Sequence, residues 1–352
     1  MKSVGTAIGV GVALFFQALG YAQSSSTIEP TATQAVGGAP GGGLIVGQTQ
    51  CDGDGNLYFR QLQGAKVVLA PIVQISADGK RSHTFDFLAQ ASKDLASLSV
   101  SDFSISGSTL YLAGSAADGK THILEYSTSD GQFNKAVTLD DTGSPDHSAQ
   151  STLSISKLGV MPSGELLIFG TRALKREVPN STPTFSYSPA LELYDVSGRF
   201  LKTVNFKSDR INLNDKAHSR EDNFASVDLA LTANGPEGVY LIAYSNKPVV
   251  YVIGPSGEIS RRIPIEPIGN EFRPISLSLI KNELLVEFVK SADGSPETTF
   301  VSYNANSGEI YSTYQLDKSM NGIFSCYDGR RTFTFVSTDG LGQRVIAFGD
   351  AR

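Results

Sequence analysis

Residues 191–206, LELYDVSGRFLKTVNF, decide the fold that we predict for this chain. Apolar residues lie on both sides of Ser197-Gly198, which is typical of two antiparallel strands joined by a tight turn. The pattern returns four times, with turns at Asp78-Gly79, Asp130-Gly131, Ser256-Gly257 and Ser307-Gly308. A unit that recurs every ~50 to 70 residues indicates a repeat architecture.

A second strand–turn–strand pattern alternates with the first. Residues 158–169, LGVMPSGELLIF, show it most clearly. Its six turns are expected at Gly55, Gly107, Gly164, Gly238, Asn282 and Gly329. Together the two patterns give four antiparallel strands per repeat, here called A to D, which is the composition of a propeller blade. We therefore predict an all-β fold: a six-bladed β-propeller of four-stranded antiparallel blades, spanning residues 44–352.

The sixth repeat lacks a recognisable strand D. Residues 344–348, RVIAF, have the pattern of its strand C. Since an open sheet edge exposes unpaired backbone groups, another segment must complete the blade. Residues 23–43 are low in complexity and end in a flexible linker, GGAPGGG, but residues 25–34 allow an extended strand. We predict that this N-terminal strand closes the ring.

The positions of the two cysteines are consistent with this closure of the ring. Cys51 ends strand A of blade one, and Cys326 occupies the matching place in blade six. These blades are neighbours in a closed ring, so we predict a disulfide across the seam. Two separately buried thiols are the alternative.

The N-terminus has the features of a secretory signal peptide, predicted at residues 1–22. Lys2 precedes an uncharged apolar run, and Gly20-Tyr21-Ala22 supplies small residues for cleavage. An uncleaved membrane anchor is the alternative. No later segment is apolar enough to span a membrane, so we expect a secreted or periplasmic monomer. The net charge of −6, without a clustered basic excess, speaks against nucleic-acid binding.

Residues 160–168, VMPSGELLI, resemble the strand–turn–strand signature of NHL-like and TolB-like six-bladed propellers. The resemblance covers residues 44–352 and implies an architecture rather than one activity. The chain contains no Trp, which disfavours propellers whose repeats depend on that residue.

The two faces of the propeller are expected to differ. The A–B and C–D turns on one face are short, whereas the other, called here the long-loop face, carries insertions at residues 171–188 and 207–223. Because loops on a rigid scaffold often bind ligands, we predict that this face binds a protein, peptide or glycan. The candidate binding residues are cations, a histidine and aromatic residues: Arg172, Lys175, Arg176, Phe185, Tyr187, Arg210, His218 and Arg220. Alternatively, Phe185 and Tyr187 begin strand C and are buried, and residues 207–223 form a solvated charged loop.

An enzymatic function is the alternative. Asp102 and Asp228 fall in predicted inner strands, where some six-bladed hydrolases hold a metal in the channel. A lactonase-like hydrolase or lyase would use them to bind a divalent metal such as calcium. Lys157 occupies the similar place in blade three and could pair with one of them. The histidines lack metal-ligand spacing and no catalytic motif is present, so we favour a non-catalytic protein without a cofactor.

Overall fold

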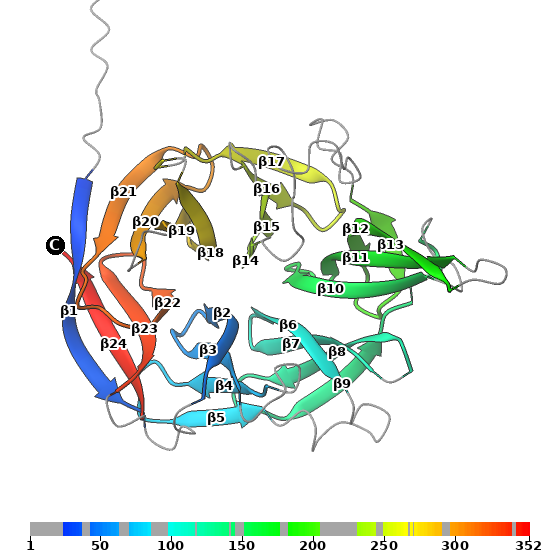
Figure 1. Ribbon diagram of the computed structural model, residues 1–352, viewed down its shortest axis with the longest axis horizontal. Coiled ribbons are helices and arrows are strands. Elements are labelled where there is room, and N and C mark those ends of the chain that lie inside the picture. The colour runs from blue at the N-terminus through cyan, green and yellow to red at the C-terminus, as the bar shows by residue number, and fades with distance from the viewer. Residues whose placement is uncertain are drawn as a thin grey trace, which may run out of the picture.

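The computed structural model describes residues 24–36, 43–62, 70–85, 98–116, 118–140, 142–144, 151–176, 182–204, 231–243, 249–266, 268–269, 271–290, 296–339 and 343–352. Every regular element in these residues is a β-strand, which confirms the predicted all-β class. The strands surround a central axis (Figure 1). No helix that could cross a membrane occurs in the described part of the chain.

The described strands form six four-stranded antiparallel blades, each running outward from the axis (Figure 1). Blade one contains β2 (Ile45–Cys51), β3 (Leu57–Gln61), β4 (Ile72–Ile75) and β5 (Ser82–Phe85). Blade two contains β6 (Ser99–Ser106), β7 (Thr109–Ser115), β8 (Thr121–Ser127) and β9 (Phe133–Thr138). Blade three contains β10 (Ser151–Val160), β11 (Leu166–Arg176), β12 (Thr184–Tyr194) and β13 (Phe200–Thr203).

The remaining blades follow the same plan. Blade four contains β14 (Leu231–Gly235), β15 (Gly238–Ala243), β16 (Val249–Ile253) and β17 (Ile259–Pro264). Blade five contains β18 (Phe272–Ile280), β19 (Glu283–Lys290), β20 (Glu297–Asn304) and β21 (Ile310–Leu316). Blade six contains β22 (Ile323–Tyr327), β23 (Thr332–Thr338), β24 (Arg344–Ala351) and β1 (Ser24–Ala35). The predicted six-bladed propeller is confirmed.

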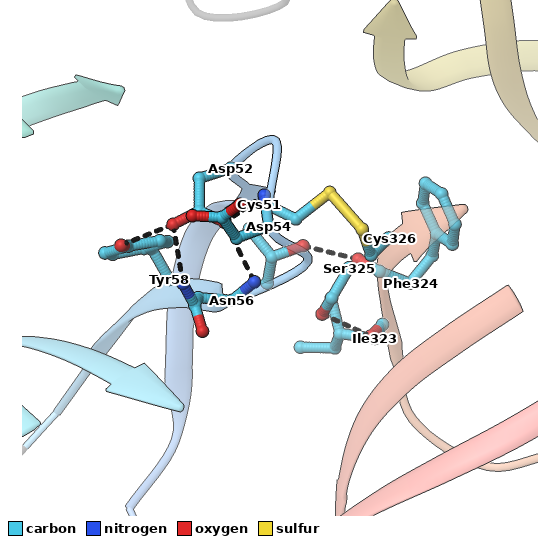
Figure 2. The surroundings of a disulfide bond; sticks show 10 residues. Cys51, Asp52, Asp54, Asn56, Tyr58, Ile323, Phe324, Ser325 and Cys326 are labelled. Carbon is cyan, nitrogen blue, oxygen red and sulfur yellow. Dashed lines mark hydrogen bonds between the residues drawn. A yellow bond between two sulfur atoms is a disulfide. The ribbon is translucent and has the colours of Figure 1, made fainter. Parts of the chain in front are cut away.

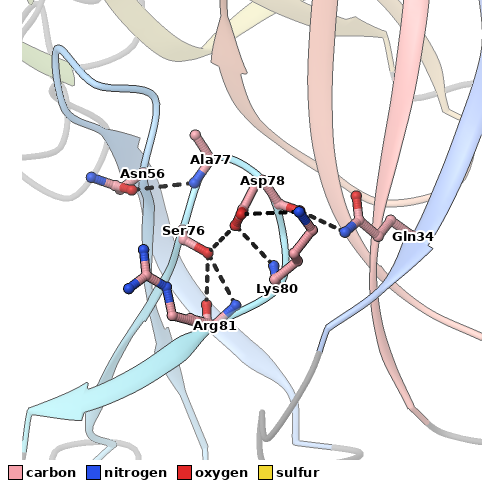
Figure 3. A network of polar contacts seen from close by, with 7 residues as sticks. All are labelled: Gln34, Asn56, Ser76, Ala77, Asp78, Lys80 and Arg81. Atoms are coloured by element: carbon pink, nitrogen blue, oxygen red, sulfur yellow. Dashed lines mark hydrogen bonds and ion pairs between the residues drawn. The ribbon is translucent and has the colours of Figure 1, made fainter.

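The N-terminal strand closes the ring, as predicted. β1 pairs antiparallel with β24, from Ile28 opposite Ala351 to Ala35 opposite Val345. The start of β1 also pairs in parallel with β21, which the sequence did not suggest, so blades five and six share one eight-stranded sheet. At the other end of β1, the Gln34 amide donates to the Asp78 carbonyl oxygen in the β4–β5 turn (Figure 3). β1 therefore contacts three successive blades.

The seam between blades six and one is also fastened beside the axis. Cys51 and Cys326 form the predicted disulfide, with their Cα atoms 5.6 Å apart (Figure 2). The Thr49 hydroxyl donates to the Phe324 carbonyl oxygen across the same seam. Closure thus depends on a covalent link near the axis and a strand at the rim.

The core is divided among the interfaces between adjacent blades. Strand β11 illustrates this arrangement, because Leu166 and Ile168 pack toward blade two while Leu167 and Phe169 pack toward blade four. Successive side chains of a strand point to opposite faces, and both faces of a blade are covered by its neighbours. The inner strands are therefore apolar at consecutive positions rather than at alternate ones.

The turn in the segment at residues 191–206 requires a glycine. Gly198 has φ +86°, and a Cβ atom there would lie 2.4 Å from the Thr138 carbonyl oxygen of blade two. The A–B turn of blade five has no glycine in the left-handed region. Lys281 occupies that region instead, with φ 56°, beside the predicted turn residue Asn282. A non-glycine residue in that region costs roughly 1 kcal/mol.

Candidate functional site

Blade three extends beyond the ring as a sheet, not as an irregular loop. β11 and β12 stay paired from Leu166–Tyr194 to Arg176–Thr184. β10 runs beside them as far as the pair Ser151–Leu174. We call residues 151–154, 171–176 and 182–190 the blade-three lobe; it projects outward from the ring in Figure 1. The insertion predicted at residues 171–188 is thus largely regular β-structure.

One face of the lobe carries two exposed aromatic rings. Phe185 and Tyr187 are 56% and 64% exposed, and their rings stack with centroids 6.5 Å apart. They occupy alternate positions of β12, opposite Lys175 and Ala173 of β11. Both residues do belong to strand C, as the alternative interpretation held. They are nevertheless exposed, because the lobe extends past the part of the ring where neighbouring blades pack.

On the face of blade three opposite the aromatic rings, Arg172 of the lobe forms a buried ion pair with Glu192, which lies just beyond the lobe in β12. Arg172 and Glu192 are 2% and 1% exposed, and the guanidinium donates to both carboxylate oxygens at 2.7 Å. The Tyr194 hydroxyl donates to the same carboxylate at 2.6 Å, and the Ser144 hydroxyl donates to it from the connection between blades two and three. A buried cation needs such partners. Arg172, a candidate contact residue from the sequence, is therefore placed inside the lobe, where it supports the sheet.

The structure describes only some of the remaining candidate residues. Lys175 is half-buried on the aromatic face, and Arg176 ends β11, although its side chain lies outside the described part. Arg210, His218, Arg220 and Asp228, the insertion at residues 207–223 and the signal peptide all lie outside the described residues.

Asp102 connects two inner strands. Its carboxylate accepts a hydrogen bond of 2.9 Å from the backbone N–H of Leu158 in blade three. Burial raises the pKa of the Asp102 carboxyl, while Lys157 and Arg60 act in the opposite direction. The charge of Lys157 thus acts on the Asp102 carboxyl, while the direct pairing that the sequence suggested stays a prediction.

The predicted channel metal would need Asp228 as well as Asp102, and Asp228 lies outside the described residues. The described residues contain no group of three or more His, Cys, Asp or Glu side chains placed to hold a metal. Asp102 already accepts backbone hydrogen bonds, and two cationic side chains interact with it. A divalent cation would have to displace or oppose those interactions.

Two hollows lie on the face of the short turns, which sequence reasoning did not select. The first, about 860 Å³, is axial and is lined by A–B turns from all six blades. Asn234 and the disulfide form part of its wall. Asn234 also joins blades across the axis: it accepts from the Val160 N–H and donates to the Ile105 carbonyl oxygen.

The second hollow, about 710 Å³, lies between blades one and two. Its polar wall is internally bonded. Asp52 accepts from the Tyr58 hydroxyl at 2.8 Å (Figure 2), and Gln74 donates to the same hydroxyl. In the adjoining β4–β5 turn, Ser76 donates to the Asp78 carboxylate (Figure 3). These hydrogen bonds stabilise the turns, and they leave fewer polar atoms for a ligand.

Glu287 of β19 is an unusual acid in blade five. No hydrogen bond or ion pair to its carboxyl is found among the described residues, and burial raises the pKa of this carboxyl from 4.5 to about 8. The native protein therefore keeps the proton at neutral pH, whereas the unfolded chain releases it.

We expect this difference to make stability pH-dependent. Below pH 4.5 the Glu287 carboxyl is protonated in both the native and the unfolded state, and the free energy of unfolding is highest. As the pH rises from 4.5 toward about 8, the unfolded chain ionises first, and the free energy of unfolding falls. Glu287→Gln should raise the free energy of unfolding by about 3 kcal/mol at neutral pH and by little at pH 4.5. Urea denaturation of both proteins at the two pH values measures the difference. An equal effect at both would contradict the assigned pKa.

The sequence matches no protein-family model. It also matches no curated protein. The fold defines the chain as a β-propeller, and solved propellers are similar to it. The Dos1 propeller is 9% identical over 92% of this chain and 95% of that chain, with a TM-score of 0.40.

Two further structures are similar at the same level. One is the β-propeller domain of the Trilobed protease from Pyrococcus furiosus, described as having an open velcro topology. It is 10% identical over 88% of this chain and 80% of that one, with a TM-score of 0.40. The other comes from a study of two prolyl endopeptidases, with 11% identity over 93% of this chain, 50% of that chain and a TM-score of 0.37. The NHL-like or TolB-like type stays a prediction.

Proposed function

We propose that this chain is an exported, non-catalytic β-propeller that binds a peptide segment of a partner protein through the blade-three lobe. The observation that carries the proposal is the exposed, stacked pair of Phe185 and Tyr187 on regular β-structure. Aromatic side chains offer a large contact area at low entropic cost, and tyrosine is enriched where binding energy concentrates.

The scaffold beneath the rings supports this role. Arg172 and Glu192 fasten β11 to β12 from the buried side, so the rings sit on a sheet that is held in place before a partner arrives. Preorganised surfaces lose less entropy on binding. Lys175 adds a cation opposite Phe185 on the same face.

Export is supported by two independent features. The first residues have the pattern of a signal peptide, and Cys51 is bonded to Cys326. Disulfides form and persist in oxidising compartments. We place the protein in the periplasm or outside the cell on these grounds. The alternative enzyme with a channel metal is not favoured, because Asp102 is already engaged by Leu158 and lies near cations.

Selection of short random peptides displayed on phage, against the immobilised disulfide-bonded protein, tests the proposal. We expect enriched peptides to bind the native protein and to bind the Phe185→Ala/Tyr187→Ala variant about 30-fold more weakly, since an anchor of this kind contributes about 2 kcal/mol. Tyr311→Ala is the matched control, because Tyr311 is 45% exposed on β21, outside the lobe.

Equal affinity of the double variant and the native protein for every enriched peptide would refute the lobe as the binding surface. A loss confined to Tyr311→Ala would move the site to blade five. Binding to a glycan array that depends on Phe185 and Tyr187, without any enriched peptide, would replace the peptide by a glycan.

A further inference from the structure

We infer that the partner segment binds as an added β-strand along the edge of β12 at residues 184–190, an inference that rests on the proposed function. The two outer strands of blade three differ in length. β12 spans Thr184–Tyr194, whereas its outer neighbour β13 spans only Phe200–Thr203. Their pairing ends at Glu192–Thr203, and one further hydrogen bond joins the Val204 N–H to the Leu191 carbonyl oxygen.

Beyond Leu191, β12 has a strand on one side only within the described residues. β11 pairs with it without a register shift as far as Arg176–Thr184. On the side of β13, no described strand pairs with residues 184–190. We call this side of residues 184–190, where no described strand pairs, the open edge; such an edge presents a row of backbone groups that can accept another strand.

The direction of these groups follows from the bond at Leu191. Its carbonyl oxygen points toward β13, and the two backbone groups of a residue face the same neighbour in an antiparallel ladder. The direction alternates along the strand, so Pro189, Tyr187 and Phe185 turn their backbone groups to the open edge. Ser186 and Ser188 turn theirs toward β11.

The open edge and the aromatic face therefore belong to the same two residues. Phe185 and Tyr187 each offer an N–H and a carbonyl oxygen at the edge, while their rings cover one face of the sheet. Pro189 has no N–H and ends the stretch that can pair fully. In strand addition, backbone hydrogen bonds provide affinity and alternate side chains provide selectivity.

These features define the partner segment. It is an extended stretch of about five residues whose alternate side chains are apolar, so that they lie beside the rings of Phe185 and Tyr187. A helix could not satisfy the edge, because its backbone groups are bonded internally. A second copy of this chain could pair edge to edge, and the experiment below separates that case.

A backbone-methylation scan of the tightest enriched peptide tests strand addition. We expect each N-methyl group to weaken binding by about 5- to 10-fold at every second residue of the bound stretch and to have little effect at the residues between. Tyr187→Pro should bind this peptide about 5- to 10-fold more weakly than Tyr187→Ala, since only proline removes the outward N–H. Thermal melting should stay unchanged, because Pro189 occupies the same kind of edge position.

Each other result rejects a defined part of the proposal. If N-methylation shows no alternation and Tyr187→Pro equals Tyr187→Ala, while loss of both rings still weakens binding, the peptide site stands and strand addition falls. If loss of both rings has no effect, the proposed function itself falls. A dimer in sedimentation velocity that Tyr187→Pro converts to monomer would assign the edge to a second copy of the chain.

Discussion

Cys51→Ser is expected to lower the free energy of unfolding by roughly 5 kcal/mol. The disulfide joins positions 275 residues apart, and a loop of that length restricts the unfolded chain strongly on the chain-entropy model. The native ring should persist without it, because β1 still pairs with β24 and β21. Far-ultraviolet circular dichroism should therefore be unchanged, while urea denaturation shows the loss.

The matched control is the variant that lacks both cysteines. Cys51→Ser/Cys326→Ser should be about as stable as Cys51→Ser, since either change removes the same bond. Mass spectrometry of the unreduced native protein should show one crosslinked peptide pair. Two free thiols, or a loss below about 1 kcal/mol, would contradict the role of the disulfide in ring closure.

Glu192→Leu is expected to cost about 3–5 kcal/mol, because it removes the carboxylate that binds the buried Arg172 guanidinium. The Tyr194 hydroxyl and the Ser144 hydroxyl would also lose an acceptor. The lobe should become less ordered as a result, and peptide binding should weaken although no contact residue has changed. Urea denaturation and peptide titration measure the two effects.

The double variant Arg172→Leu/Glu192→Leu separates charge burial from packing. It should recover much of the stability lost by Glu192→Leu, since a buried pair can be replaced by apolar side chains at small cost. Additive destabilisation by the two substitutions would show that Arg172 and Glu192 do not act as a pair.

Much of the fold could be predicted because each propeller repeat has a recognisable strand–turn–strand pattern in a short stretch of sequence. Turn glycines such as Gly164 and Gly198 mark the strand ends, and their left-handed φ angles explain why glycine is needed. Because the sixth repeat lacks its outer strand, the N-terminal strand could be predicted to close the ring. Closure makes blades one and six neighbours, and this predicted the disulfide between their cysteines. The parallel pairing of β1 with β21 could not be predicted, because it depends on how far β1 extends from Ile28 toward the N-terminus.

The candidate site was predicted less completely. The insertion at residues 171–188 was visible as extra length, but length does not distinguish a loop from a continued hairpin. The burial of Arg172 could not be predicted, because its partner Glu192 lies across the β11–β12 ladder and the register of that ladder cannot be read from either strand alone. A signal was present: Arg172 and Glu192 lie within two apolar strands, where a charge is stable only when it is paired.

The hollows on the short-turn face were missed for a geometric reason. Each A–B turn is short, yet six of them around one axis leave a hollow of about 860 Å³. No single turn carries that information. Similarly, the link from Asn234 to Val160 and Ile105 depends on the arrangement of blades two, three and four.

Amide hydrogen exchange, with and without the tightest enriched peptide, tests most directly whether the blade-three lobe is the binding surface. We expect the peptide to slow exchange at Phe185 and Tyr187, whose N–H groups face the open edge, with little change at Ser186 and Ser188, which face β11. Protection at Gly107 and Lys281 in the axial hollow, with none in the lobe, would contradict the proposal and place the site on the opposite face.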